Sequence, residues 1–184
     1  MIDLLKQFEE TPEAYPTVPG GLSDGAAALD GNMIWQRIEA YVAHRWTPRE
    51  VVWTLQGNGG DDFVPKLTPM TSYSARFWGD QWKGLTLENG PLGVILPVCG
   101  IYQIIAQVGD GDVPAAVSEA FRRLAEYSAE IGVDSLIAGH PSHTSHDVSI
   151  DGALSESFKR SVTWTARSMQ LSGAADLLRP YRRA

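Results

Sequence analysis

The pattern of apolar and polar positions changes its period twice along the chain. Between Val51 and Val108 the two kinds of residue tend to alternate, in the runs VVWTLQ, YSARFW, KGLTLE, LGVILPV and YQIIAQV. Such alternation is typical of strands that bury one face. Asn89-Gly90 lies between two of these runs and predicts a hairpin there. We therefore expect a small, mostly antiparallel sheet of about four or five strands.

A helical pattern follows directly after these strands. In residues 112–132, DVPAAVSEAFRRLAEYSAEIG, the apolar positions recur at helical spacing. Pro114 suits the first turn of a helix, and Gly132 suits the left-handed conformation that ends one. The core residues predicted on this central helix are Val117, Phe121, Leu124 and Tyr127.

Two further helices are predicted before the sheet. A short one covers residues 2–10 and is followed by an extended arm rich in proline and glycine, which reaches residue 31. The second begins with Asn32 as its cap and ends before Pro48. Trp35 and Trp46 lie on its apolar side and join the predicted core set.

The region after the central helix is more polar. The run HPSHTSHDVSIDG predicts a loop, and a final helix is expected to begin near Ser155. Pro180 ends a last short turn, after which Tyr181 and Arg182 are expected to project. The pattern as a whole predicts an α+β fold, in which amphipathic helices pack with a small sheet. Its expected parts are an N-terminal helix and arm (1–31), a core domain (32–132), and a loop with a C-terminal helix and tail (133–184).

Composition narrows the possible functions. The net charge of −7 argues against a general nucleic-acid binder. The charge is uneven, because residues 1–31 carry one lysine against six acids, whereas residues 151–184 carry six basic residues against three acids. The single cysteine excludes an intramolecular disulfide. No run of about 18 apolar residues occurs, so no membrane-spanning helix is expected.

Candidate chemistry is sparse. His140, His143 and His146 form the only cluster that resembles a metal site, and three imidazoles could bind zinc. Their spacing falls in a polar loop rather than on a rigid element, so solvated histidines are the preferred interpretation. No phosphate-binding loop, dinucleotide fingerprint or nucleophile elbow is present. The sequence therefore predicts a protein that is not an enzyme and has no cofactor.

Aromatic residues gather in the predicted strands. Trp53, Trp78 and Trp82, with Tyr73 and Phe77, could form a face that stacks on sugars or peptides. Alternation places some of them on opposite faces, so core and subunit packing is preferred. A β-rich module that binds a ligand or metal, through this face or the histidine loop, remains the alternative function. A zinc hydrolase is a more distant possibility.

Three runs together resemble the head-to-tail adaptor proteins of long-tailed bacteriophages and gene transfer agents. They are IEAYVAHRWTPREVVWTLQG, YQIIAQVGDGDVPAAVSEAFRRLAEYSAEI and SGAADLLRPYRRA. The last is most similar to the gene transfer agent branch. The family usually begins with a fuller pair of N-terminal helices than the arm of this chain allows.

The resemblance implies a structural role at the head–tail junction of a virion made in the host cytoplasm. Such adaptors form a ring, commonly of twelve copies, between the portal protein and the stopper or tail-completion proteins. DNA passes through the ring without specific binding. A net acidic chain suits such a channel, because it would not retain phosphates.

The C-terminal tail is the predicted portal contact. Its two leucines could press into a groove of the portal, and its arginines and tyrosine are residue types frequent at binding hot spots. The predicted interface consists of Leu177, Leu178, Arg179, Tyr181, Arg182 and Arg183.

Overall fold

The computed structural model describes residues 2–137, 145–150, 154–159 and 167–182. Helices hold 30% of the residues and strands 33%, which confirms the predicted α+β class. The chain forms two compact units, each built from separate stretches. Unit 1 comprises residues 1–16, 41–113 and 181–184, and unit 2 comprises residues 17–40 and 114–180. This division replaces the predicted boundaries after residues 31 and 132, because both units draw on early and late parts of the chain.

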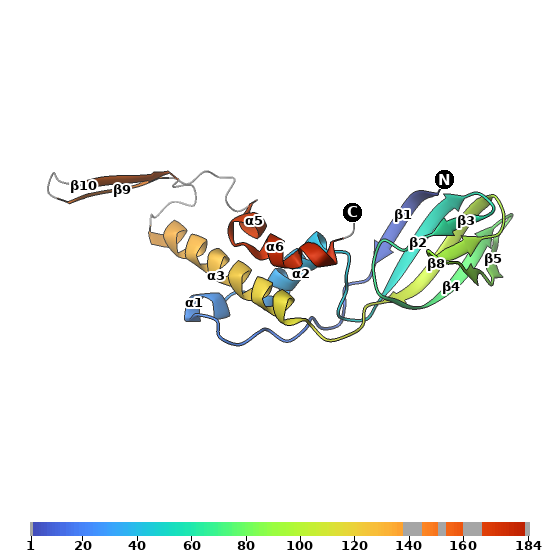
Figure 1. The fold of residues 1–184 in the computed structure, drawn as a ribbon, viewed down its shortest axis with the longest axis horizontal. Coiled ribbons are helices and arrows are strands. Elements are labelled where there is room, and N and C mark those ends of the chain that lie inside the picture. The colour runs from blue at the N-terminus through green and yellow to red at the C-terminus, as the bar shows by residue number, and fades with distance from the viewer. Residues whose placement is uncertain (1, 138–144, 151–153, 160–166, 183–184) are drawn as a thin grey trace. The chain divides into compact units, whose positions relative to one another are not determined.

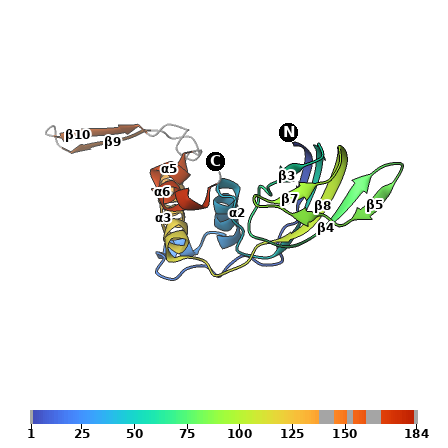
Figure 2. The ribbon, with the colours of Figure 1, turned by 45° about the vertical axis from the view of Figure 1, so that its right-hand side comes forward.

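Unit 1 contains an antiparallel sheet of five strands in the order β1-β2-β8-β4-β5 (Figure 1). Strand β5 lies at one margin of this sheet and β1 at the other (Figure 2). A smaller sheet has the order β3-β7-β6. The strands are β1 (Asp3–Glu9), β2 (Arg49–Gly57), β3 (Asp61–Phe63), β4 (Met70–Trp78), β5 (Trp82–Leu85), β6 (Glu88–Asn89), β7 (Val94–Leu96) and β8 (Gly100–Val108).

Alternation in β2 and β8 explains how the core of unit 1 forms. Val51, Trp53 and Leu55 are fully buried, whereas the residues between them are partly exposed. Tyr102 and Ile104 repeat this pattern on the neighbouring strand. These side chains share one cluster with residues of the smaller sheet. The alternation in the sequence therefore corresponds to one face of these strands that is buried and one that is more exposed.

The N-terminal prediction is wrong, because residues 3–9 form strand β1 instead of a helix. The spacing of Leu5 and Phe8 fits a helix, yet both side chains are more than half exposed. A bulge between Leu4 and Lys6 interrupts the alternation, so the strand pattern is hidden. Pairing with β2 along its whole length decides the conformation. The predicted arm is irregular from residue 10 to 23, but its last part contains the short helix α1 (Asp24–Ala27), which was not expected.

The predicted hairpin at Asn89-Gly90 is confirmed. Asn89 of β6 pairs with Val94 of β7, and the N–H of Gly90 donates to the carbonyl of Gly93 at 2.7 Å. Strand β3 was not expected, because its sequence begins in a cluster of turn residues. Its Phe63 is nevertheless buried against Trp53, with ring centroids 5.6 Å apart.

Unit 2 is mainly helical. The long helix packs against the three short ones, and Trp35 packs on Phe121 with ring centroids 4.9 Å apart. Val117, Phe121 and Leu124 are buried as predicted, whereas Tyr127 is only half-buried. The helices are α1 (Asp24–Ala27), α2 (Gly31–Tyr41), α3 (Ala115–Ile137), α5 (Ser168–Leu171) and α6 (Ala174–Leu178).

Three predicted helix boundaries are corrected. Helix α3 continues through Gly132, because a glycine weakens a helix without stopping it. The N-terminus of α2 is capped by Asp30, whose side chain accepts from the N–H of Asn32 at 2.9 Å. Helix α2 ends at Tyr41, so Trp46 is buried beyond the helix, in unit 1.

The predicted histidine loop and final helix are also corrected. The antiparallel strands β9 (Ser145–Ile150) and β10 (Leu154–Lys159) occupy part of that region. The second half of β9, DVSI, alternates between polar and apolar residues, and Asp151-Gly152 lies between the two strands. That combination is a hairpin signal which the helical spacing of residues 154–169 obscured. A 3-10 turn, η1 (Arg179–Tyr181), follows α6.

Candidate functional site

The C-terminal tail does not project freely but folds back within unit 1. The carbonyl of Tyr181 accepts from the N–H of Ala43 at 3.1 Å. Its ring lies edge-on to those of Trp46 and His44, at centroid distances of 5.8 and 6.1 Å. The prediction that Tyr181 extends past the last helix is therefore wrong, because aromatic packing and a backbone hydrogen bond hold it.

Arg182 is fixed in the same way while remaining exposed. Its guanidinium lies 4.5 Å from the ring centroid of Tyr41, and its Nη1 donates to the Tyr41 hydroxyl at 3.1 Å. Cations favour the face of an aromatic ring, so the two contacts reinforce each other. The tail is thus ordered up to Arg182.

This geometry changes the predicted portal interface. Leu178 is fully buried in unit 2, so it cannot form an exposed apolar foot. Leu177 is half-buried, and Arg179 and Arg182 are exposed. Arg183 lies outside the described residues. The two described arginines are therefore the members of the predicted set best placed to meet a partner.

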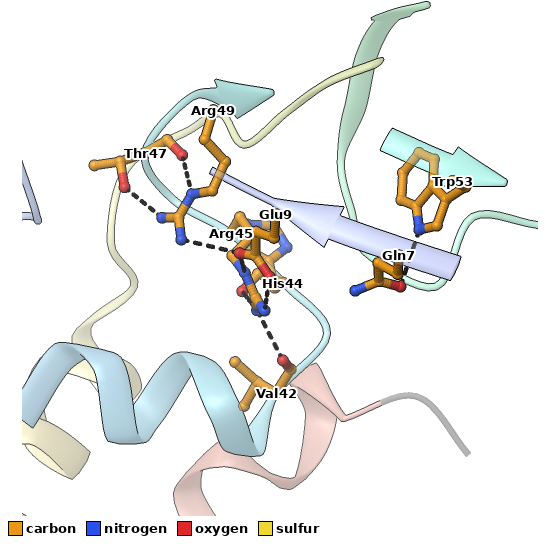
Figure 3. Close-up of polar contacts among 8 residues, drawn as sticks. All are labelled: Gln7, Glu9, Val42, His44, Arg45, Thr47, Arg49 and Trp53. Carbon is orange, nitrogen blue, oxygen red and sulfur yellow. Dashed lines mark hydrogen bonds and ion pairs between the residues drawn. The ribbon is translucent and has the colours of Figure 1, made fainter. Parts of the chain in front are cut away.

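Residues 41–49, which we call the junction segment, also hold a buried ionic cluster (Figure 3). Glu9 at the end of β1 accepts from Arg45 at 2.5 and 3.0 Å and from Arg49 at 3.0 Å. Both arginine side chains are almost completely buried, at 7% and 3% exposure, whereas that of Glu9 is 24% exposed. Arg49 also donates to the hydroxyl and the carbonyl of Thr47. A carboxylate shared by two buried guanidinium groups therefore fastens β1 to the junction segment.

Opposing effects act on the acidity of Glu9. Burial would raise its pKa, but hydrogen bonds and positive charge from Arg45 and Arg49 outweigh burial and lower the pKa. Glu9 is therefore ionised in the folded protein at neutral pH. A further anchor lies on β1, where the Gln7 side chain accepts from the indole N–H of Trp53 at 3.0 Å.

His44 is a titratable group next to the tail, with its ring 6.1 Å from that of Tyr181. Partial burial lowers its pKa and the charge of Arg45 lowers it further, while a hydrogen bond with the backbone of Asp110 opposes both. The imidazole is therefore neutral at pH 7 and packs on Trp46 at a centroid distance of 4.8 Å. Neutrality suits a ring that packs among aromatic side chains.

The histidine cluster receives no structural support. His140 and His143 lie outside the described residues, and for His146 only the backbone, in β9, is described. Within the described part of the chain, no three His, Cys, Asp or Glu side chains come close enough to hold a metal ion. Over the same residues, no helix is long and apolar enough to cross a membrane.

The aromatic strand residues do not share one platform. Trp53 is fully buried, whereas Trp78 and Trp82 are exposed and pack together with centroids 5.0 Å apart. A cleft of about 500 Å³ opens nearby, between residues 73–75 of β4 and residues 84–87. Neither exposed tryptophan lines this cleft, so the cleft and the aromatic pair are separate features.

The ionic cluster was not predicted from the sequence. Glu9 lies 36 and 40 residues from its partners, so no local spacing signals the pairing. Cys99 is exposed, with Sγ 3.5 Å from the side-chain oxygen of Asn58.

With this geometry established, the chain was compared with known proteins. No protein-family model, curated protein or solved structure matches it.

Proposed function

We propose that this protein is a head-to-tail connector of a phage or phage-like particle, in which it forms a ring between the portal and the tail-completion proteins. The observation that carries the proposal is the resemblance of three runs to such adaptors, together with the elements those runs form. The first run covers the end of α2, the junction segment and β2. The second covers β8 and most of α3, and the third covers α6 and the tail. In this role no reaction is catalysed.

Charge supports the proposal. The chain is acidic overall, at −7, and a channel lined with carboxylates would let DNA pass without retaining it. The tail carries the opposite sign, with exposed guanidinium groups on Arg179 and Arg182. Guanidinium groups bind carboxylates in a bidentate geometry, so an acidic groove of the portal is the partner that these residues suit.

A charge reversal in the tail tests this function without disturbing the core. Deleting residues 177–184 would remove the buried Leu178, so Arg179→Glu with Arg182→Glu is the sharper variant. The wild-type chain should form a complex with portal protein in native mass spectrometry, and the double variant should lose it. Lys66→Glu, which reverses an exposed charge elsewhere, is the matched control and should keep the complex.

Two results together would refute the proposal. The wild-type chain would form no complex with the portal, and heads assembled without this chain would still acquire tails. If the double variant keeps the complex, the tail is not part of the interface, but the connector role still stands. Circular dichroism of both variants verifies that the fold is kept.

A further inference from the structure

Two exposed apolar patches lie at opposite margins of the five-stranded sheet. The β1 patch consists of Leu5 and Phe8, which are 52% and 56% exposed. The hairpin patch consists of Trp78 and Trp82 at the turn between β4 and β5, which are 43% and 36% exposed. Large apolar side chains grouped on a surface are typical of contact sites, and tryptophan is among the residues most enriched in hot spots.

The register places Phe8 and the hairpin patch on the same face of the sheet. Phe8 is opposite Val52 of β2, Val52 is opposite Ile105 of β8, and Ile105 is opposite Ser74 of β4. Ser74 and Trp78 lie four residues apart on one strand, so they point to the same side. This is the side away from the core, because Val51 and Trp53 point inward.

We propose that the β1 patch of one copy of this chain packs against the hairpin patch of the next copy. The inference rests on the proposed function, for which it identifies the surface that joins neighbouring subunits. A contact between two different patches is heterologous, so each copy keeps one free patch for a further neighbour. Such a contact closes into a ring when the rotation between copies allows it, whereas a two-fold dimer would either pair a patch with itself or make the β1–hairpin contact twice and leave no patch free.

The charges around the two patches complement each other. Exposed carboxylates outnumber exposed bases at the β1 patch, whereas exposed bases outnumber exposed carboxylates at the hairpin patch. On or next to β1 these residues are Asp3 and Glu10 against Lys6; at the hairpin they are Arg76, on the face of the patch, and Lys83, on the opposite face, against Asp80. Opposite charge favours the heterologous contact, and like charge disfavours pairing of a patch with its own copy.

Side chains, rather than a continued sheet, carry this contact. The bulge between Leu4 and Lys6 and the lysine itself are features that block the addition of a strand to an open edge. They do not impede contact through Leu5 and Phe8, whose side chains stand away from the core. A tryptophan pair offers a broad apolar surface for those two side chains.

Cross-linking distinguishes this arrangement from a two-fold dimer. In a Cys99→Ser background, Lys6→Cys places a thiol beside the β1 patch, and Gln81→Cys places one in the turn of the hairpin. A flexible bis-maleimide should convert the double-cysteine chain into a ladder of covalent oligomers. Each single-cysteine chain can give at most a dimer, so these two variants are the controls.

Variants of the patches show which side chains carry the contact. Adding Phe8→Ser or Trp82→Ser to the double-cysteine chain should abolish the ladder. Leu92→Ser, at a residue that is 71% exposed in the same unit, should leave the ladder intact. Circular dichroism shows that each variant is folded.

The outcomes separate this inference from the proposed function. The inference is overturned if the double-cysteine chain gives no ladder under both conditions, free at high concentration and bound to portal-bearing heads. A ladder that persists in both patch variants overturns it as well. In either case binding of the wild-type chain to the portal would leave the proposed function standing. A ladder without any binding to the portal, together with tails that attach to heads lacking the chain, would support the contact and refute the connector role.

Discussion

The two compact units are held together by different kinds of interaction. In unit 1 an apolar core is combined with Glu9, which is ionised and shared between the buried Arg45 and Arg49. In unit 2 the helices pack through apolar side chains such as Leu124 and Phe121. That unit has polar contacts as well: Ser23, the cap of α1, donates to Glu126 at an exposed position, and Arg37 donates to the buried Ser168. Acid and charge removal at Glu9 should therefore weaken unit 1, whereas loss of volume should weaken the core around α3 in unit 2.

The largest effect is expected from Leu124→Ala in unit 2. The side chain is fully buried, so its truncation leaves a cavity and lowers the free energy of unfolding by about 2–5 kcal/mol. Hydrogen exchange of the α3 amides measures the loss. Leu171→Ala, at a half-exposed position in the same unit, is the control and should cost less than about 0.5 kcal/mol. A similarly small loss for Leu124→Ala would contradict the placement of Leu124 in the core of unit 2.

Glu9→Gln is the corresponding test for unit 1. It leaves the charges of Arg45 and Arg49 uncompensated where both side chains are buried. Breaking a buried ion pair costs about 3–5 kcal/mol, and partial exposure of Glu9 reduces the expected loss to about 2–4 kcal/mol. Denaturant unfolding provides the measurement. Glu10→Gln, at the exposed neighbouring position, should have almost no effect.

The pH dependence of stability gives a further test of the role of Glu9. The pKa of Glu9 is lower in the folded protein than its ordinary value of 4.5, so the unfolded chain binds a proton more readily. The stability that Glu9 contributes is complete above pH 4.5 and is lost as the pH falls through the folded pKa. The protection factors of the β1 amides, which are corrected for the intrinsic pH dependence of exchange, should therefore fall in acid in the wild-type chain. In Glu9→Gln this contribution to the pH dependence should disappear, and an unchanged profile would refute the role of the cluster.

Periodicity in the sequence was a sound guide where the burial of one face decided the structure. Strands β2 and β8 and helix α3 were all predicted, because their alternate or helical positions are buried. It misled at β1, where Leu5 and Phe8 are exposed and a bulge disturbs the alternation. Conformation there depends on pairing with β2, which is distant in sequence.

The contacts around the junction segment could not be predicted for the same reason. The sequence predicted Trp46 as a core residue and Tyr181 and Arg182 as members of a projecting tail, but it gave no sign that Tyr181 would pack on Trp46. That contact joins residues 135 positions apart, and side-chain contacts over such a separation leave no periodic signal. A terminal tyrosine after a proline is equally compatible with a free tail.

Gly109→Ala should produce an intermediate effect in unit 1. Gly109 has φ +110°, a left-handed conformation, and a Cβ at this position would meet the carbonyl of Thr47 in the junction segment. Strain of this kind costs about 1–3 kcal/mol. Thermal unfolding measures it, with Gly84→Ala as the control because its Cβ would enter open space. Equal melting temperatures for the two variants would mean that the junction segment adapts without cost.

The smallest expected effect concerns the tail. Arg182→Ala removes the contact with the face of Tyr41 and one hydrogen bond, both at an exposed position. Cation–π contacts at such positions contribute about 0.5–1 kcal/mol, so exchange at the amides of η1 should accelerate several-fold while the core strands are unchanged. Arg179→Ala removes an equally exposed guanidinium and should leave that exchange rate close to the wild-type value. If both variants accelerate exchange alike, general charge rather than the Tyr41 contact orders the tail. If only Arg182→Ala accelerates exchange, the contact between Arg182 and Tyr41 orders the tail. Arg182 also belongs to the proposed portal contact. Binding to the portal would therefore have to keep the contact with Tyr41 or replace it.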